Sequence, residues 1–155
     1  MFTEIQKRAI DEKLELLTKI KKGELPAQKL AELITKRRIN WFEANKSILE
    51  KYHNLPDEEK AYRIICFDHM NINPEHSKMI RLCVGLINIK SYNFCPYLEA
   101  CKQLGLDTSI ICKEIGEPSI KELCRRINPN IGFSRDYEKL RPYNECCEEF
   151  FSYEI

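Results

Sequence analysis

The chain has 155 residues, a mass of 18.4 kDa and 25 basic against 24 acidic residues, so its formal net charge is +1. This length suits a single domain with a core of its own. The near-zero charge provides no global field that would attract nucleic acid or an anionic membrane surface. No apolar run approaches the roughly 18 residues that a membrane-spanning helix needs. We therefore expect one domain over residues 1–155, with neither a nucleic acid nor a membrane as partner.

The chain contains eight cysteines. Its N-terminal segment MFTEIQKRAIDEKLELL is charged throughout and contains no apolar stretch typical of a signal peptide. We therefore expect a cytoplasmic protein, in which thiols stay reduced and clustered cysteines serve metal binding, redox chemistry or packing.

The N-terminal part, residues 1–70, has the pattern of helices. Apolar residues recur at helical spacing over residues 3–22, and Gly23 follows as a stop. A second stripe starts after Pro26 and predicts a helix that reaches about His53. Pro56 and the acidic residues after it predict a third helix over residues 57–70. We expect the first two helices to form a helical hairpin.

The C-terminal part, residues 78–155, has a mixed and cysteine-rich pattern. Nearly alternating apolar residues predict a strand over residues 78–92. The segments PYLEACKQLG, DTSIICKEIG and PSIKELCRRI predict short helices that end at Gly105, Gly116 and the Asn128–Pro129 turn. IGFSRDYEKL and CCEEFFSYEI predict two further strands. The fold class is therefore α+β: a helical N-terminal half packs on a small antiparallel sheet, with short helices inserted between strands.

Cys95 is the candidate nucleophile or metal ligand. It directly precedes Pro96, where a helix is predicted to begin. A helix N-terminus stabilises thiolate charge, so we expect the pKa of Cys95 to fall below its usual value of about 8.5.

The remaining cysteines divide into candidate ligands and packing residues. Cys66 and Cys83 lie in apolar runs and are interpreted as core residues, protected from reagents. No Cys-x-x-Cys occurs, so a metal site would draw its ligands from separate elements. Because neighbouring side chains of a strand point to opposite faces, only one of Cys146 and Cys147 can face such a site. The predicted metal ligands are Cys95, Cys101, Cys112 and Cys147, with Cys124 as the alternative to Cys101.

Two other patterns are interpreted as surface features. His69 and His76 lie in a segment that offers a hard-metal or general-base site, but without ligand spacing a solvated loop is favoured. The basic residues 36–38 next to Trp41 could contact a nucleic acid, but three cations on one helical turn are typical of a solvent-facing surface.

The segments NFCPYLEACKQLGL, SIICKEIG, RINPNIGFSRDYEKL and NECCEEFF together resemble the C-terminal pattern of the L-2-amino-thiazoline-4-carboxylic acid hydrolase-like family. The resemblance covers roughly residues 90–152 and departs from the family pattern at RPYNEC and at KEIG. It implies that Cys95, Cys112 and Cys147 gather in one site, and that the enzyme would hydrolyse carbon–nitrogen bonds of a cyclic amidine. The matched positions are Cys95, Cys112, Asn128, Pro129, Arg135 and Cys147.

The sequence is compatible with three functions. The first is a cysteine-centred domain that binds zinc or an iron–sulfur cluster and a small molecule. The second is a small hydrolase with Cys95 as nucleophile, in which Arg135 and Arg141 bind the substrate carboxylate, unless they pair with nearby acidic residues. The third is a non-catalytic sensor that forms a homodimer through its N-terminal helices.

Overall fold

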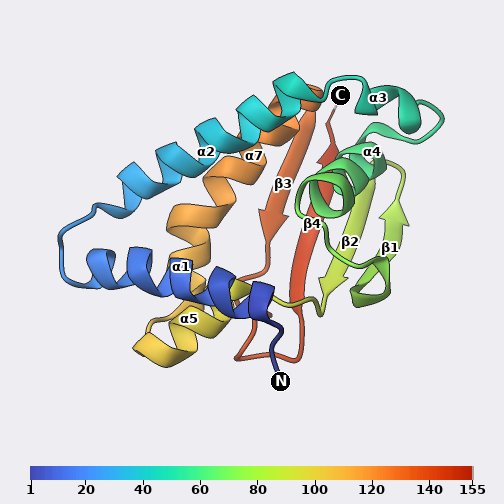
Figure 1. Ribbon diagram of the computed structural model, residues 1–155. Coiled ribbons are helices and arrows are strands. Elements are labelled where there is room, and N and C mark those ends of the chain that lie inside the picture. Colours follow the sequence, from blue (N-terminus) through green and yellow to red (C-terminus); the bar gives the residue numbers. More distant parts are fainter. Residues whose placement is uncertain (155) are drawn as a thin grey trace.

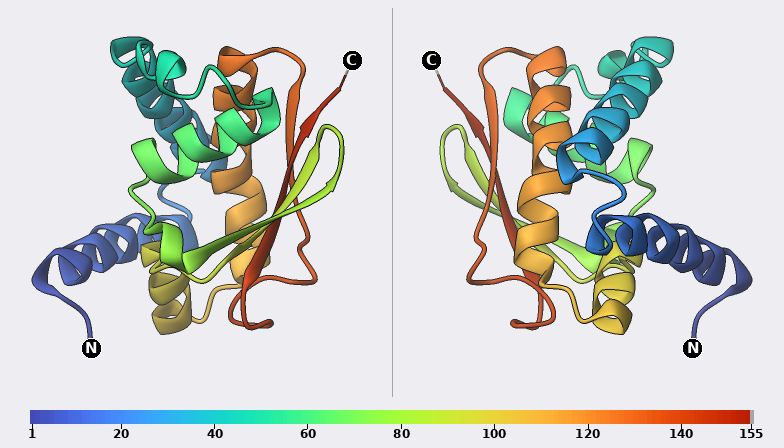
Figure 2. Two further views of the ribbon diagram at one scale, coloured as in Figure 1. Left: turned by 90° about the vertical axis from the view of Figure 1, so that its right-hand side faces the viewer. Right: turned by 90° about the vertical axis from the view of Figure 1, so that its left-hand side faces the viewer.

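The computed structural model describes residues 1–154 and shows an α+β fold, which confirms the predicted class (Figure 1). One antiparallel sheet has the strand order β1-β2-β4-β3. Helices lie against one face of this sheet, and none in the described chain covers the other face (Figure 2). The strands are β1 (Ser77–Cys83), β2 (Leu86–Ser91), β3 (Ile131–Arg135) and β4 (Cys147–Tyr153).

Helix α1 (Glu4–Lys21) matches the helix predicted over residues 3–22. Thr3 Oγ1 accepts a hydrogen bond from the Gln6 backbone N–H at 3.1 Å, and Gln6 Oε1 accepts one from the Thr3 N–H at 3.0 Å. This reciprocal pair satisfies two backbone donors that a helix start leaves free. The buried Leu17 and Ile10 lie on the inner side of α1, which packs along α5 (Pro96–Leu104).

The second predicted helix ends earlier than expected, because α2 (Ala27–Ala44) stops well before His53. Asn45 Nδ2 donates to the Trp41 carbonyl at 2.8 Å and so satisfies an acceptor at the helix end. The remaining predicted part is a turn and the short α3 (Ile48–Lys51). The expected hairpin also differs, since α1 and α2 diverge from their turn and α2 packs on α7 (Glu117–Ile127) (Figure 1).

The third predicted helix is confirmed in extent. It comprises α4 (Asp57–Arg63) and the π-helical segment η1 (Ile64–His69). A short 3₁₀ turn, η2 (Pro74–His76), then leads into β1.

The predicted stop at Gly116 is wrong. Helix α6 (Thr108–Ile111), the π-helical segment η3 (Cys112–Gly116) and α7 follow one another without a break. Gly116 has a φ of −77°, which is helical, so its lack of a side chain is not used for a turn here.

The strand predicted over residues 78–92 is a hairpin of β1 and β2 instead of one strand. Gly85 lies at the turn with a φ of +80°, a conformation that favours glycine. A Cβ at this position would lie 3.1 Å from the Tyr153 carbonyl oxygen of β4. The near-continuous apolar pattern conceals this turn, because both strands of the hairpin contribute to it.

Two apolar clusters form the core. The first lies between the sheet and helices α4 and α7, and includes Ile65, Leu123 and Phe151. The second lies between α1, α2 and α5, and includes Leu17 and Leu30. No helix within residues 1–154 is long and apolar enough to cross a membrane.

Candidate functional site

The candidate site lies at one end of the sheet, where β2 and β3 end and β4 begins (Figure 1). Strand register pairs Ser91 with Cys147 and Arg135 with Glu149. Phe151, on the same parity of β4, is fully buried in the core. Cys147 and Glu149 therefore face the helices, which decides between the two adjacent cysteines.

An inner cavity of about 90 Å³ occupies this end of the sheet. Its polar groups come from the sheet, from the segment after β2, from η3 and from the β3–β4 connection. Five of the predicted site residues line it together. They are Cys95, Cys112, Cys147, Arg135 and Arg141, accompanied by Ser91, Asn93 and Glu149.

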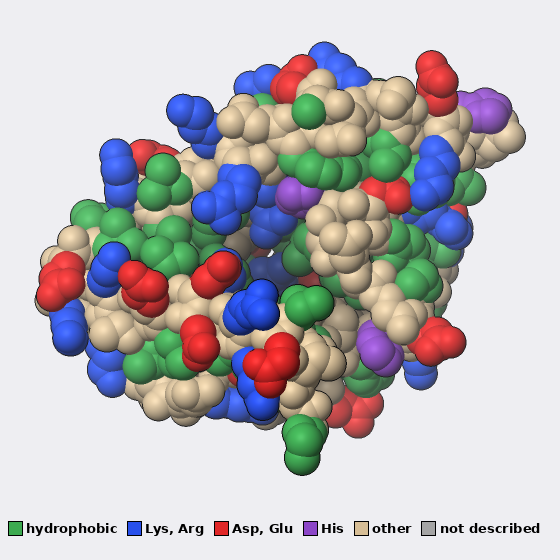
Figure 3. All heavy atoms as spheres, viewed as in Figure 1, with side chains coloured by type: hydrophobic (Ala, Val, Ile, Leu, Met, Phe, Trp, Pro, Cys, Tyr) green, Lys and Arg blue, Asp and Glu red, His purple; other side chains and the backbone are tan. Residues whose placement is uncertain are grey.

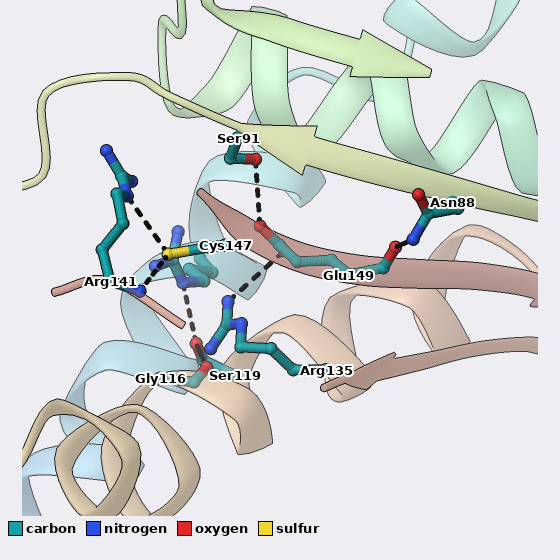
Figure 4. A network of polar contacts seen from close by, with 9 residues as sticks. Asn88, Ser91, Gly116, Ser119, Arg135, Arg141, Cys147 and Glu149 are labelled. Atoms are coloured by element: carbon teal, nitrogen blue, oxygen red, sulfur yellow. Dashed lines mark hydrogen bonds and ion pairs between the residues drawn. The ribbon is translucent and has the colours of Figure 1, made fainter. Parts of the chain in front are cut away.

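Arg135 and Glu149 form an ion pair inside this cavity. Arg135 Nη2 lies 3.4 Å from Glu149 Oε2, and the two side chains are only 13% and 14% exposed. Ser91 Oγ donates to the other carboxylate oxygen at 3.2 Å (Figure 4). Burial is the largest single cause and lowers the pKa of Arg135, but the acidic groups around it, Glu149 first among them, together outweigh burial and the net shift is upward. Arg135 therefore pairs with Glu149, not with the neighbouring acidic residues considered from sequence.

Arg141 holds the sulfur of Cys147. Its Nε donates to Cys147 Sγ at 3.2 Å, and its backbone N–H lies 3.5 Å from the same atom (Figure 4). The guanidinium is fixed from the other side, because Nη1 donates to the Asn93 carbonyl at 2.6 Å. Thr108 Oγ1 also donates to the Arg141 carbonyl at 2.7 Å. These contacts tie the β3–β4 connection to the start of β4.

Cys95 is the N-cap residue of α5, as expected. Its predicted low pKa is wrong: burial raises the pKa of this thiol, and the backbone amides of Leu98 and Tyr97 and the charge of Arg141 offset only part of that effect. The pKa of Cys112 is raised to about 12, again chiefly by burial. Desolvation thus dominates over the helix N-terminus at this position.

A larger outer cleft of about 580 Å³ adjoins the inner cavity. It lies between α1, α2, the segment that follows η1 and the start of α5, and Figure 3 shows a hollow with Lys and Arg side chains at its rim and inside it. Met70, Ile72, Asn93 and Cys95 line both spaces, so the two adjoin each other. Within residues 1–154, no carboxylate lines the outer cleft.

Two cations of the outer cleft, Lys13 and Arg38, have no ion-pair partner among the described residues. Arg38 Nε donates to the Ser119 hydroxyl at 2.8 Å, which draws the side chain inward from α2. Burial is the largest cause that lowers the pKa of both groups. Glu12 raises the pKa of Lys13 in part, while neighbouring arginines lower the pKa of both cations. The outer cleft therefore carries two cations without a direct ion-pair partner in the described chain.

His69 adds a neutral polar group to the wall of the outer cleft. Its ring lies against Trp41, with the ring centroids 4.4 Å apart. Its Nδ1 is buried without a hydrogen-bond partner among the described residues. Burial, followed by the charge of Arg38, lowers the pKa of His69 to about 4. His69, placed in a solvated loop from sequence, is therefore an uncharged cleft residue at neutral pH.

Several cysteine predictions need correction. Cys101 is buried between α1 and α5 and does not line the cavity, so it does not join the other three predicted ligands. Cys124, the alternative, packs in the sheet core. Cys83 is exposed instead of protected, because it ends β1 at the tip of the hairpin. Cys66 is buried as predicted but also lines the inner cavity.

The predicted metal set is therefore not assembled as a whole. Among residues 1–154, no three His, Cys, Asp or Glu side chains have an arrangement that could hold a metal ion. A zinc or iron–sulfur centre stays a prediction from the cysteine pattern.

Arg38 is the functional candidate that sequence reasoning assigned to the solvent-facing side of its helix. The signal was in the spacing: Arg38 follows Ile34 by four residues and precedes Trp41 by three, so it lies on the apolar face of α2. Lys13 carries a comparable signal, since it follows Ile10 by three residues and precedes Leu17 by four, and these are the buried residues of α1.

Searches against protein-family models, curated proteins and solved structures found no match to this chain.

Proposed function

We propose that the protein binds a small carboxylate-bearing molecule, with the carboxylate in the outer cleft and the rest of the ligand directed toward the inner cavity. The observation that carries this proposal is the pair of unneutralised cations, Lys13 and Arg38, in a cleft whose described lining contains no carboxylate. A cation that loses water on folding without gaining a counter-charge raises the energy of the empty site. An anionic ligand supplies that charge in surroundings where electrostatic attraction is strong.

The dimensions of the site support a small organic ligand. Ordinary ligand pockets enclose roughly 300–1,000 Å³, and the outer cleft at about 580 Å³ lies within that range. The inner cavity, at about 90 Å³, has room only for the end of such a molecule. His69 Nδ1, buried without a partner in the described chain, supports an additional hydrogen bond to the ligand.

The carboxylate is assigned to Lys13 and Arg38 in preference to the two arginines proposed from sequence. Arg135 already pairs with Glu149, and Arg141 directs its donors to Cys147 and Asn93. A second carboxylate next to Glu149 would add like charge in a poorly solvated space. Arg135 and Arg141 therefore shape the inner end of the site.

Calorimetric titration with small carboxylates, among them thiazolidine-4-carboxylate, and with the matching primary amides tests this proposal. Each pair has nearly the same shape and differs in charge. We expect the carboxylate of at least one pair to bind at least about tenfold more tightly than its amide, equivalent to about 1.4 kcal/mol. We also expect Arg38→Met to remove this difference, because it deletes the charged donor and keeps the apolar stem.

Lys36→Met is the matched control. Lys36 is exposed on the same helix and does not line the outer cleft, so its replacement makes the same change in net charge outside the cleft lining. If Lys36→Met weakens binding as much as Arg38→Met, the effect comes from the overall charge and the assigned site is wrong. Equal binding of carboxylates and amides throughout the panel would also contradict the proposal.

A further inference from the structure

Cys147 differs from the other three thiols of the inner cavity, Cys66, Cys95 and Cys112, in the group that contacts its sulfur. Arg141 Nε donates to Cys147 Sγ at 3.2 Å, whereas no guanidinium donates to Cys95 or Cys112 in the described chain. An arginine side chain stays protonated in proteins and has only donors. A thiol is a weak acceptor for such a donor, while a thiolate is a strong one, so the contact stabilises negative charge on the sulfur.

Arg141 is fixed in this orientation by contacts on both sides. Its Nη1 donates to the Asn93 carbonyl at 2.6 Å, and its own carbonyl accepts from Thr108 at 2.7 Å. Its backbone N–H also points to the sulfur, at 3.5 Å. Two donors from one residue are therefore preorganised on Cys147 Sγ, which is the requirement for an activated cysteine.

The space that contains this sulfur adjoins the outer cleft. Cys147 is only half-buried and lines the inner cavity, which shares Asn93 and Cys95 with the cleft. In the proposed arrangement, a molecule held by its carboxylate at Lys13 and Arg38 directs its other end past these shared residues. The electrophilic end of such a molecule would then lie near Cys147, not near the solvent.

We propose that Cys147 is a nucleophile that attacks an acyl carbon of the anionic molecule bound in the cleft, with Arg141 as its positioning residue. The choice of an anionic substrate rests on the proposed function; the choice of Cys147 does not. The Sγ–C bond forms while the π electrons of the C=O bond move onto oxygen. That pair then returns, the bond to the leaving group breaks, and the leaving group departs with its electron pair and takes a proton from water in the open cleft. Water subsequently attacks the thioester carbon and gives a proton to the hydroxide left by the preceding step. The C–S bond then breaks with its electron pair on sulfur, which releases the carboxylic acid and the Cys147 thiolate.

Competitive alkylation with iodoacetate and iodoacetamide tests this inference on the wild-type protein. The two reagents are similar in size and differ in charge; in each case the sulfur forms a bond to the methylene carbon and iodide leaves with its electron pair. Peptide mass spectrometry gives the rate at each cysteine, and a metal chelator is present throughout. The exposed Cys83 is the internal reference. At neutral pH we expect Cys147 to react at least about tenfold faster than Cys83, because two donors of Arg141 contact its sulfur.

The charge of the reagent separates this inference from the proposed function. We expect the ratio of iodoacetate to iodoacetamide rates to be about fivefold or more higher at Cys147 than at Cys83, since the cations of the cleft attract the anion. Arg38→Met should abolish that preference, and Lys36→Met, at an exposed residue outside the cleft lining, should leave it unchanged. Arg141→Lys should slow the reaction at Cys147 with both reagents, because lysine cannot reproduce the two-point contact with Asn93 and the sulfur.

Each outcome identifies which statement fails. If Cys147 reacts no faster than Cys83 with either reagent, the assignment of Cys147 as the nucleophile is wrong, even if calorimetry shows that carboxylates bind. If Cys147 reacts fastest but shows no preference for iodoacetate, and carboxylates bind no better than amides, the assigned carboxylate site is wrong. The assignment of Cys147 as the nucleophile is then still supported. If Cys95 is labelled before Cys147, the proposal is also wrong, and the nucleophile is Cys95, as the sequence predicted.

Discussion

The neutral, buried state of His69 predicts that the protein loses stability in mild acid. The pKa of His69 is about 4 in the folded protein and 6.5 in an unfolded chain. Between these values the unfolded chain binds a proton that the folded protein does not, so acidification favours unfolding. The contribution is small above about pH 6.5, grows as the pH falls and reaches its limit near pH 4. Arg38 and the ring of Trp41 face this histidine, and neither is an acid that would stabilise the protonated form.

The size of the effect follows from the two pKa values. Linkage gives a loss of about 2 kcal/mol in the free energy of unfolding at pH 5 relative to pH 8. Because the ring is partly accessible to solvent, we expect about half of this, about 1 kcal/mol. Urea denaturation followed by circular dichroism at several pH values measures it. Carboxylates contribute to the same slope, so the informative quantity is the difference between wild type and His69→Asn.

His53→Asn is the matched control, because His53 is exposed and does not line the outer cleft or the inner cavity. We expect His69→Asn to flatten the dependence between pH 8 and pH 5, and His53→Asn to leave it as in the wild type. The reasoning is refuted if the wild type and His69→Asn lose the same free energy over this interval. A bound carboxylate near Arg38 should reduce the loss, since it favours the protonated imidazole.

Two further predictions concern the residues that build the site. Arg135→Met leaves the Glu149 carboxylate buried without its cation, so we expect a loss of about 3 kcal/mol in urea denaturation at neutral pH; a loss below about 1 kcal/mol would indicate that water already solvates this pair. Phe151→Ala removes a fully buried ring from the sheet core and should cost about 3–5 kcal/mol, whereas Phe150→Ala, on the face without helices, should cost clearly less, and equal losses would contradict the assigned register.

The sequence predicted helices and strands where a local pattern was sufficient. Helix α1 and the helix from Asp57 matched, because each has a clear start signal and an apolar stripe. The hairpin of β1 and β2 was missed, since its turn contains only one glycine, Gly85, between two apolar strands. What requires glycine there is the approach of the Tyr153 carbonyl from a strand distant in sequence. Contacts between residues far apart in the sequence do not change the local spacing of apolar residues, so this spacing does not reveal them.

The sequence predicted which residues form the candidate site better than it predicted how these residues are arranged. Cys95, Cys112 and Cys147, which were expected to gather, line one cavity. The choice of Cys147 over Cys146 could not be made from sequence, because composition on the two parities of β4 is alike and only the burial of Phe151 fixes the inner face. The pKa of Cys95 was misjudged because desolvation depends on packing from several elements.

The near-zero net charge of the chain conceals a strong local asymmetry. Lys13, Arg38, Arg135 and Arg141 line the two adjoining spaces, against Glu149 as the one carboxylate of the described lining. Because the rest of the surface balances these charges, the attraction that they exert falls off within roughly a Debye length, about 8–10 Å in physiological salt. The site should therefore select anions after they enter the cleft and not steer them from a distance. Rising ionic strength should then weaken carboxylate binding only modestly, in contrast to a nucleic-acid site, where affinity falls steeply with salt.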